Sequence, residues 1–182
     1  MKTLPTDIPD VVIFEPGLHG DRRGYFMETW RADLFAAAGV DQPFVQDNQS
    51  SSHQGVLRGL HYQVQQPQGK LVRVISGSVF DVVVDLRKSS QTFGKWVGAE
   101  ISAANRRLIW VPPGFGHGFY VLSEQAEFVY KCTDYYAPEH ERVIRFDDPQ
   151  IGIEWPLLAG VETILSEKDL GGAPLDEADL FD

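Results

Sequence analysis

Nine short runs of β-branched and aromatic residues, each bounded by turn residues, constrain the fold more than any other feature of this chain. Many closely spaced strands are typical of an antiparallel sandwich or barrel. Only 31–39 and the region after Ser166 are helix-like, too little for alternating strand–helix units. The sequence therefore predicts an all-β fold with a few short helices. The runs are VVIFE (11–15), YFMETW (25–30), VLRGLHY (56–62), KLVRVIS (70–76), SVFDVVVDL (78–86), WVGAEIS (96–102), RLIWV (107–111), GFYVLS (118–123) and EFVYKCTD (127–134).

Two neighbouring runs, 70–76 and 78–86, are joined by Ser76-Gly77, a pair typical of tight turns. We therefore expect these two runs to pair as a hairpin. In the second run, apolar residues at positions 80, 82, 84 and 86 alternate with a mixed set that includes Asp81 and Asp85. This period of two predicts one apolar face and one mixed face.

Length and charge narrow the class of protein. The 182 residues, 43% of them hydrophobic, suit one domain spanning 1–182, with the acidic stretch from about 171 to 182 as a loosely held tail. A net charge of -10 argues against nucleic-acid and anionic-membrane partners, because like charges repel. The lone Cys132 cannot form an intramolecular disulfide, and no apolar run has the length of a signal peptide or membrane span. These features predict a cytoplasmic protein.

The segment GVLRGLHYQ (55–63) places Arg58 and His61 in an otherwise apolar strand, and Lys70 follows shortly after it. Buried arginine requires an acceptor, and histidine is suited to proton transfer near neutral pH. Strict alternation would place Arg58 and His61 on opposite faces of the strand. Gly59 lies between them, and a glycine in a strand often marks a bulge that redirects a side chain. Either the segment has a wet structural face, or it lines a site.

Two other segments contain candidate functional residues. WVPPGFGHGF (110–119) encloses His117 in a rigid, glycine-rich turn, and LSEKDL (165–170) carries Lys168 and Asp169 side by side. The first segment is similar to the second motif of metal-binding cupins. Those proteins also need an H-x-H pair and a nearby glutamate, and the chain contains no H-x-H. Because two isolated histidines do not supply three ligands, we expect no metal.

Taken together, nine segments, which follow one another from about residue 8 to residue 170, resemble the dTDP-4-dehydrorhamnose 3,5-epimerase family. The resemblance implies a cupin-type jelly roll and a homodimer that exchanges N-terminal strands, with no metal or organic cofactor. It also implies inversion of C3 and C5 of dTDP-4-dehydro-6-deoxy-D-glucose, a step of dTDP-L-rhamnose synthesis. The segments are GDRRGYFMETW, FVQDNQSSS, GVLRGLHYQ, QGKLVRVISGSVFDVVVDLR, TFGKWVGAEIS, WVPPGFGHGF, EFVYKCTDYY, IGIEWP and LSEKD.

The resemblance also implies catalytic roles. His61 would be the base, Tyr130 the acid on the opposite face of the sugar, and Asp169 the partner that orients His61. Lys70 is suited to stabilise the charge that grows on the C4 oxygen. From the residues alone, Asp81 and Asp85 remain alternatives to Asp169 as the partner of His61.

Further residues match the family's binding positions or suit the diphosphate. Cationic groups suit the diphosphate, and a planar guanidinium can donate two hydrogen bonds to its oxygens. Amides can read the edge of a thymine base, which charge alone cannot do. Phe26 suits contact with the base. The cations are Arg23, Arg58, Lys70 and Lys168. The resemblance implies that Glu28, Gln46 and Asn48 contact the nucleotide and that His117 and Glu141 are further binding residues.

Three alternatives remain open at this stage. The nearest is a single-site epimerase or a 3,4-ketoisomerase of dTDP-sugars on the same fold. The second is a jelly roll that binds a sugar nucleotide without catalysis, and the third is a metal-dependent cupin oxygenase. Jelly rolls host many functions, so the fold alone does not separate these alternatives.

Overall fold

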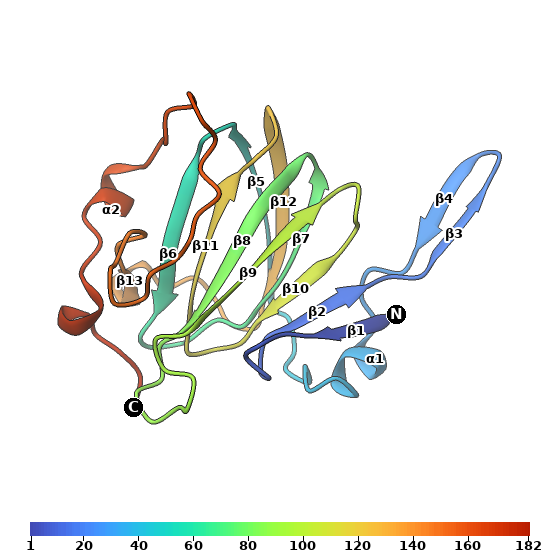
Figure 1. Ribbon diagram of the computed structural model, residues 1–182. Helices are drawn as coiled ribbons and strands as arrows, with labels where there is room; N and C mark the ends of the chain where they lie inside the picture. The colour runs from blue at the N-terminus through green and yellow to red at the C-terminus, as the bar shows by residue number, and fades with distance from the viewer.

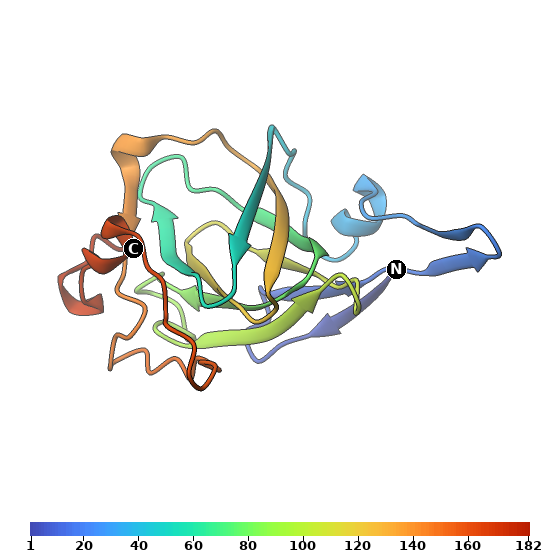
Figure 2. The ribbon, with the colours of Figure 1, turned by 90° about the horizontal axis from the view of Figure 1, so that it is seen from above.

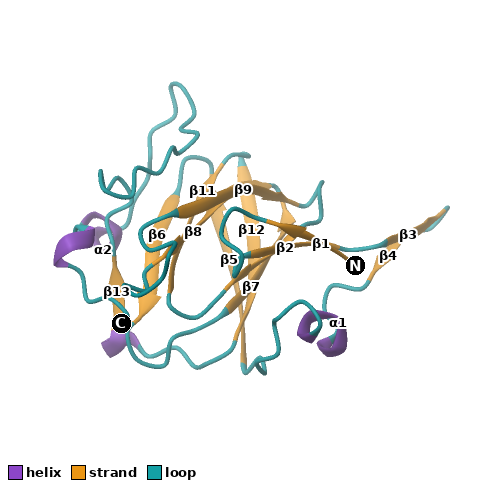
Figure 3. Ribbon diagram, turned by 60° about the horizontal axis from the view of Figure 1, so that its bottom comes forward, coloured by secondary structure: helices purple, strands orange, loops and turns teal.

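The computed structural model describes residues 1–182, and strands make up most of its regular structure (Figures 1 and 3). The helices are α1 (Ala32–Ala36), α2 (Glu167–Leu170) and the 3-10 helices η1 (Pro138–His140) and η2 (Leu175–Glu177). The strands are β1 (Lys2–Pro5), β2 (Val12–Glu15), β3 (Leu18–Asp21), β4 (Gly24–Met27), β5 (Gln46–His53), β6 (Leu57–Gln63), β7 (Lys70–Ser76), β8 (Ser78–Asp85), β9 (Trp96–Ser102), β10 (Leu108–Val111), β11 (Phe115–Val121), β12 (Gln125–Cys132) and β13 (Glu141–Val143).

Two antiparallel sheets form the body of the molecule. One has the strand order β1-β2-β10-β7-β12-β5 and the other β13-β6-β11-β8-β9. Apolar residues from both sheets meet in a buried cluster that includes Val72, Val83, Ile109 and Phe128. Seen from above, the strands curve around this interior (Figure 2). The predicted antiparallel sandwich is confirmed. Its two curved sheets enclose one interior, as in a jelly roll.

The hairpin β3–β4 projects from this body as an arm (Figures 1 and 2). Its two strands pair only with each other, and most of their residues are exposed. An isolated two-stranded hairpin is marginally stable in water. The arm is therefore the part of the fold with the least support from its own chain.

The outer faces of the two sheets are covered by different segments. The region around α1 places Phe35 and Val40 over Phe14 and Trp110 of the first sheet. The C-terminal third of the chain places Ile144, Ile151 and Leu175 over Leu60, Val82 and Val84 of the second sheet. Each sheet therefore has both faces occupied over much of its area.

The expected loose tail at 171–182 is wrong. Leu175 is buried, and its backbone N–H donates to Asp148. The Phe181 N–H donates to the Leu86 carbonyl, and the Tyr62 hydroxyl donates to the Asp179 carbonyl. The acidic composition hid the apolar residues that hold the segment against the second sheet.

The expected hairpin of 70–76 with 78–86 is also wrong. β7 pairs with β10 and β12, whereas β8 pairs with β11 and β9 in the other sheet. Ser76-Gly77 is therefore a crossover between sheets. Gly77 has φ 75°, and a Cβ there would lie 2.0 Å from the Gln125 carbonyl oxygen, so the crossover needs glycine. A glycine turn signals a change of direction, but not which sheet the next strand joins.

The other expectations for secondary structure are confirmed. Each of the nine runs contains a strand, and α1 and α2 fall where helix was expected. The Ser166 side chain caps α2 by accepting the Asp169 N–H. In β8, Val82 and Val84 face the outer cluster, while Val83 faces the interior. No helix is long and apolar enough to span a bilayer.

Candidate active site

A cavity of about 320 Å³ opens between the two sheets. Alternate residues of β5 and β12 line one side, and residues of β6 and β11 line the other. Nine of the residues expected to form a site lie here together. The full lining is Gln46, Asn48, Ser50, Arg58, His61, Gln68, Lys70, His117, Gly118, Phe119, Phe128, Tyr130, Tyr136, Glu141 and Lys168.

The His61 side chain on β6 pairs with Asp169 of α2. Nε2 of His61 lies 2.6 Å from Oδ1 of Asp169. Asp169 also accepts the Gly59 N–H at 3.1 Å and the Ser166 hydroxyl at 2.6 Å. These contacts fix the carboxylate, which in turn orients the imidazole and leaves its other nitrogen, Nδ1, free of any protein partner.

The rival carboxylates are engaged elsewhere. Asp81 lies 3.0 Å from His117, and Asp85 accepts from Arg87, Ser90 and Thr92. β8 is separated from β6 by β11, so neither aspartate is on a strand adjacent to His61. The geometry favours Asp169 as the orienting partner.

Burial and charge set the protonation of this pair. Burial of the Asp169 carboxyl opposes its ionisation. Hydrogen bonds from His61, Ser166 and the Gly59 N–H outweigh burial and hold the pKa of Asp169 below its usual range. Burial lowers the pKa of His61, while the Asp169 hydrogen bond opposes that shift and the nearby Lys168 adds to it. At neutral pH the imidazole is therefore ready to accept a proton.

A bulge at Gly59 brings Arg58 and His61 into the same cavity. His61 pairs with His117 and Arg58 pairs with Phe119, so β6 has one more residue in this interval than β11. Gly59 has φ 118°, and a Cβ there would lie 2.6 Å from both the Gly118 Cα and the His117 carbonyl oxygen. The bulge therefore requires glycine, and the predicted redirection is confirmed.

Lys70 on β7 and Tyr130 on β12 come from the sheet that faces His61. Burial lowers the pKa of the Lys70 ammonium and raises the pKa of the Tyr130 phenol. Tyr130 thus keeps its proton at neutral pH. The cavity therefore has an imidazole on one wall and a phenol and an amino group on the other.

Three side chains form a bridge at the edge of the cavity. Lys168 lies 3.0 Å from Glu141, and the Tyr136 hydroxyl donates to Glu141 at 3.0 Å. The Tyr136 N–H donates to Gln46. Tyr136 was not singled out from the sequence, because YYAP reads as a loop.

Four further lining residues are not predicted from the sequence: Ser50, Gln68, Phe119 and Phe128. Ser50 lies on β5, a polar strand that the search for apolar runs overlooked. Its alternation of Gln46, Asn48 and Ser50 toward the cavity was the available signal.

Three expected binding residues lie outside the cavity of their own chain. Arg23 and Phe26 are on the projecting arm, and Glu28 follows it. Phe26 is 69% exposed, Arg23 pairs with Asp21, and Glu28 lies 3.7 Å from Arg31. Within one chain, the arm contributes nothing to the cavity.

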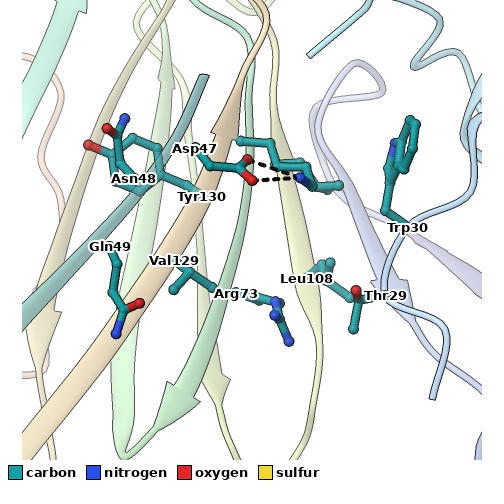
Figure 4. Close-up of a pocket in the computed structure, with 11 residues that line it drawn as sticks. Thr29, Trp30, Asp47, Asn48, Gln49, Arg73, Leu108, Val129 and Tyr130 are labelled. Carbon is teal, nitrogen blue, oxygen red and sulfur yellow. Dashed lines mark hydrogen bonds and ion pairs between the residues drawn. The ribbon is translucent and has the colours of Figure 1, made fainter. Parts of the chain in front are cut away.

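A second cavity, of about 370 Å³, lies on the outer face of the first sheet (Figure 4). Asp47 and Arg73 project into it, and the dashed lines at Asp47 mark its ion pair with Lys131 at 2.9 Å. No histidine lines this cavity. Tyr130 lines both cavities, whereas His61 and His117 line the interior one.

Comparison with known proteins gives a consistent result. The sequence model of the dTDP-4-dehydrorhamnose 3,5-epimerase family matches residues 5–177. A dTDP-4-dehydrorhamnose 3,5-epimerase from Pseudomonas aeruginosa is 56% identical over 182 residues, which cover 100% of this chain and 99% of that protein.

Two solved structures are informative. A dTDP-6-deoxy-D-glucose-3,5-epimerase from Legionella pneumophila, in complex with dTDP-4-keto-L-rhamnose, has a TM-score of 0.94 at 52% identity, over 98% of this chain and 94% of that chain. A 3'-monoepimerase from Streptomyces bikiniensis, in complex with dTDP-quinovose, has a TM-score of 0.87 at 36% identity, over 94% and 87% of the two chains.

Fold and cavity together define a cupin-type isomerase, in which imidazole and phenol groups face each other across the interior of a jelly roll. Within that class, the chain belongs to the dTDP-4-dehydrorhamnose 3,5-epimerase family.

Proposed function

We propose that this protein inverts C3 and C5 of dTDP-4-dehydro-6-deoxy-D-glucose to give dTDP-4-dehydro-L-rhamnose, in dTDP-L-rhamnose biosynthesis in the cytoplasm. The observation that carries the proposal is the His61–Asp169 pair facing Lys70 and Tyr130 across one cavity. These residues supply a base, an acid and a cation, so the reaction needs no metal or organic cofactor.

The chemistry uses the acidity of a C–H bond beside a ketone. His61 takes the proton from the carbon next to C4, and the electrons of that bond move onto the C4 oxygen to form an enolate. The Lys70 ammonium stabilises this oxygen as its charge grows. Tyr130 then gives its proton to the opposite face of the same carbon, which inverts the centre. The phenol regains a proton, and His61 loses one, before the second carbon reacts.

The nucleotide half of the substrate is held by charge and amide contacts. Arg58 and Lys168 line the cavity and suit the diphosphate oxygens. Gln46 and Asn48 on β5 suit the donor and acceptor edge of thymine. Release of Lys168 from Glu141 would free its ammonium for a phosphate.

We further propose a homodimer in which the arm of each subunit reaches the cavity of the other. The strands of the arm pair with no other strand of their own chain, and the one cation–π contact of the arm with the body is that of Arg106 over the Tyr25 ring; the arm carries the exposed Phe26 and Arg23. β5, which lines the cavity, is the outermost strand of its sheet and has an unpaired edge. In such a dimer, Phe26 would lie against the base and Arg23 and Glu28 near the nucleotide.

Proton exchange tests the catalytic proposal. In deuterated water, NMR of dTDP-4-dehydro-6-deoxy-D-glucose with the wild type should show exchange at both C3 and C5. His61→Asn should slow both exchanges by roughly 10²–10⁴-fold, the usual contribution of a general base. Exchange at one carbon alone would indicate a single-site epimerase, and movement of the ketone to C3 a ketoisomerase. No exchange with dTDP still bound would indicate a binding protein.

A further inference from the structure

A second histidine–aspartate pair faces the same cavity. His117 on β11 lies directly opposite His61 on β6 in the strand register, so the two imidazoles are neighbours on one wall. Both carboxylate oxygens of Asp81, on the next strand, β8, lie 3.0 Å from Nε2 of His117. Asp81 is 0% exposed, and its side chain has no other hydrogen-bond partner. A buried carboxylate can only accept hydrogen bonds, so it requires a proton on Nε2.

The other ring nitrogen of His117 faces the cavity. Nδ1 has no hydrogen-bond partner within the protein. It is also not one of the fully buried side-chain nitrogens that lack a partner, which are Nε of Arg106 and Nε of Arg107. Nδ1 is therefore not fully buried, and His117 lines the interior cavity. With the proton held on Nε2, Nδ1 of the neutral ring carries a lone pair and accepts a hydrogen bond.

We propose that Asp81 is a positioning residue: it holds His117 in the tautomer whose Nδ1 accepts a hydrogen bond from a sugar hydroxyl, and this contact presents C3 of the sugar to His61. The inference rests on the proposed function and deepens it. It assigns the selection between the two reacting carbons to a carboxylate that touches no part of the substrate.

The chemistry of the sugar explains why this contact would govern C3. In a 4-keto-6-deoxyhexose, the C3 side of the ketone carries hydroxyls at C2 and C3. The C5 side carries a methyl group and the ring oxygen, and neither donates a hydrogen bond. An acceptor in the wall can therefore hold only the hydroxyl-bearing edge. Phe119 and Phe128 supply apolar surface in the same cavity, where a methyl group can lie.

The tautomer can be read without turnover. In ¹⁵N NMR, the wild-type His117 ring should show a protonated Nε2 and an unprotonated Nδ1. Asp81→Asn, which keeps the shape but offers an N–H as well as an oxygen, should release the ring from that single form. A wild-type ring protonated on Nδ1 alone would overturn the inference.

The ratio of exchange rates tests the consequence. In Asp81→Asn, exchange at C3 should fall about tenfold relative to exchange at C5, the effect of losing one hydrogen bond in the transition state. Affinity for dTDP should be unchanged. Asp85→Asn is the matched control: it removes a second buried carboxylate of β8, whose partners lie outside the cavity, and should leave the ratio unaltered.

The outcomes separate the inference from the proposed function. An unchanged C3-to-C5 ratio in a folded Asp81→Asn variant would overturn the inference while leaving the epimerase intact. No exchange in the wild type would overturn the proposed function, and the tautomer measurement would still decide what Asp81 does. If Asp81→Asn does not fold, His117→Gln keeps a donor for Asp81 but lacks Nδ1, so it should show the same loss at C3.

Discussion

The reactivity of His61 depends on three kinds of neighbour. Burial favours the neutral ring, the charge of Lys168 acts in the same direction, and Asp169 opposes both. The folded pKa of His61 therefore lies below its ordinary 6.5. Since the base must be neutral to accept a proton, activity should persist as the pH falls to 6.5 and decline only below it.

Replacement of Asp169 should change the pH below which activity declines. Asp169 raises the pKa of His61 against the effect of burial, so Asp169→Asn should shift the acidic limb of the kcat/KM profile to lower pH. Loss of the fixed tautomer should also lower kcat by roughly 10²–10⁴-fold. The measurement is a pH–rate profile of wild type and variant.

Glu167→Gln is a suitable control for that profile, because Glu167 lies on the same helix, α2, and is exposed. It should leave both kcat and the acidic limb in place. An acidic limb that moved to higher pH in Asp169→Asn would contradict the assignment of Asp169 as the partner of His61.

At the scale of strands, what the sequence predicts depends on how much apolar surface each strand buries. β7 and β9 coincide with their predicted runs because their side chains pack into the core. β5 escaped detection because its cavity-facing residues are polar and its edge is free. The crossover after β7 was not predicted for another reason. The sheet that a strand joins is set by the topology of the whole chain, and no local sequence pattern encodes it.

The candidate site, like the strands, was predictable only in its local features. The types of residue in GVLRGLHYQ, and the glycine between Arg58 and His61, indicated both a site and a bulge. The partners Asp81 and His117 could not be matched from the sequence, because their contact joins two strands whose register only the fold supplies. Local chemistry was predictable, while contacts between distant strands were not.

Gly59→Ala tests the bulge directly. The positive φ and the close approach of Gly118 should together cost about 2–4 kcal/mol of unfolding free energy, and kcat should fall because Arg58 and His61 are both displaced. Chemical denaturation and steady-state rates measure the two effects.

Gly160→Ala separates strain from crowding. Gly160 also has a positive φ, 77°, but a Cβ there would meet nothing within 4 Å. It should cost about 1 kcal/mol and leave kcat unchanged. Equal losses in the two variants would show that backbone strain alone, and not the packing of the bulge against β11, accounts for the effect at Gly59.

For the whole molecule, charge is distributed so that an acidic protein can bind an anion. The net charge is -10, yet Arg58, Lys70 and Lys168 line the cavity against the single carboxylate of Glu141. Low-dielectric walls focus this local positive potential. In the proposed dimer, the arm would add Arg23 to the cavity of the other subunit, and the complete binding site would then depend on assembly.

Mixed dimers test whether the arm works in the partner's cavity. At a substrate concentration well below the KM of Phe26→Ala, both homodimers should show little turnover: Phe26→Ala because substrate binding is weakened, and His61→Asn because the base is lost. In an exchanged heterodimer, the cavity with intact His61 receives the intact Phe26 of the other subunit. A mixture allowed to exchange subunits at equal amounts should therefore recover about a quarter of the wild-type sites, because half of the dimers are mixed and each has one complete cavity.

Mixing His61→Asn with Lys70→Ala should recover nothing, since both changes damage the cavity of their own chain. If the first mixture stayed as inactive as the second while mass spectrometry showed heterodimers, the arm would act within its own subunit or not at all.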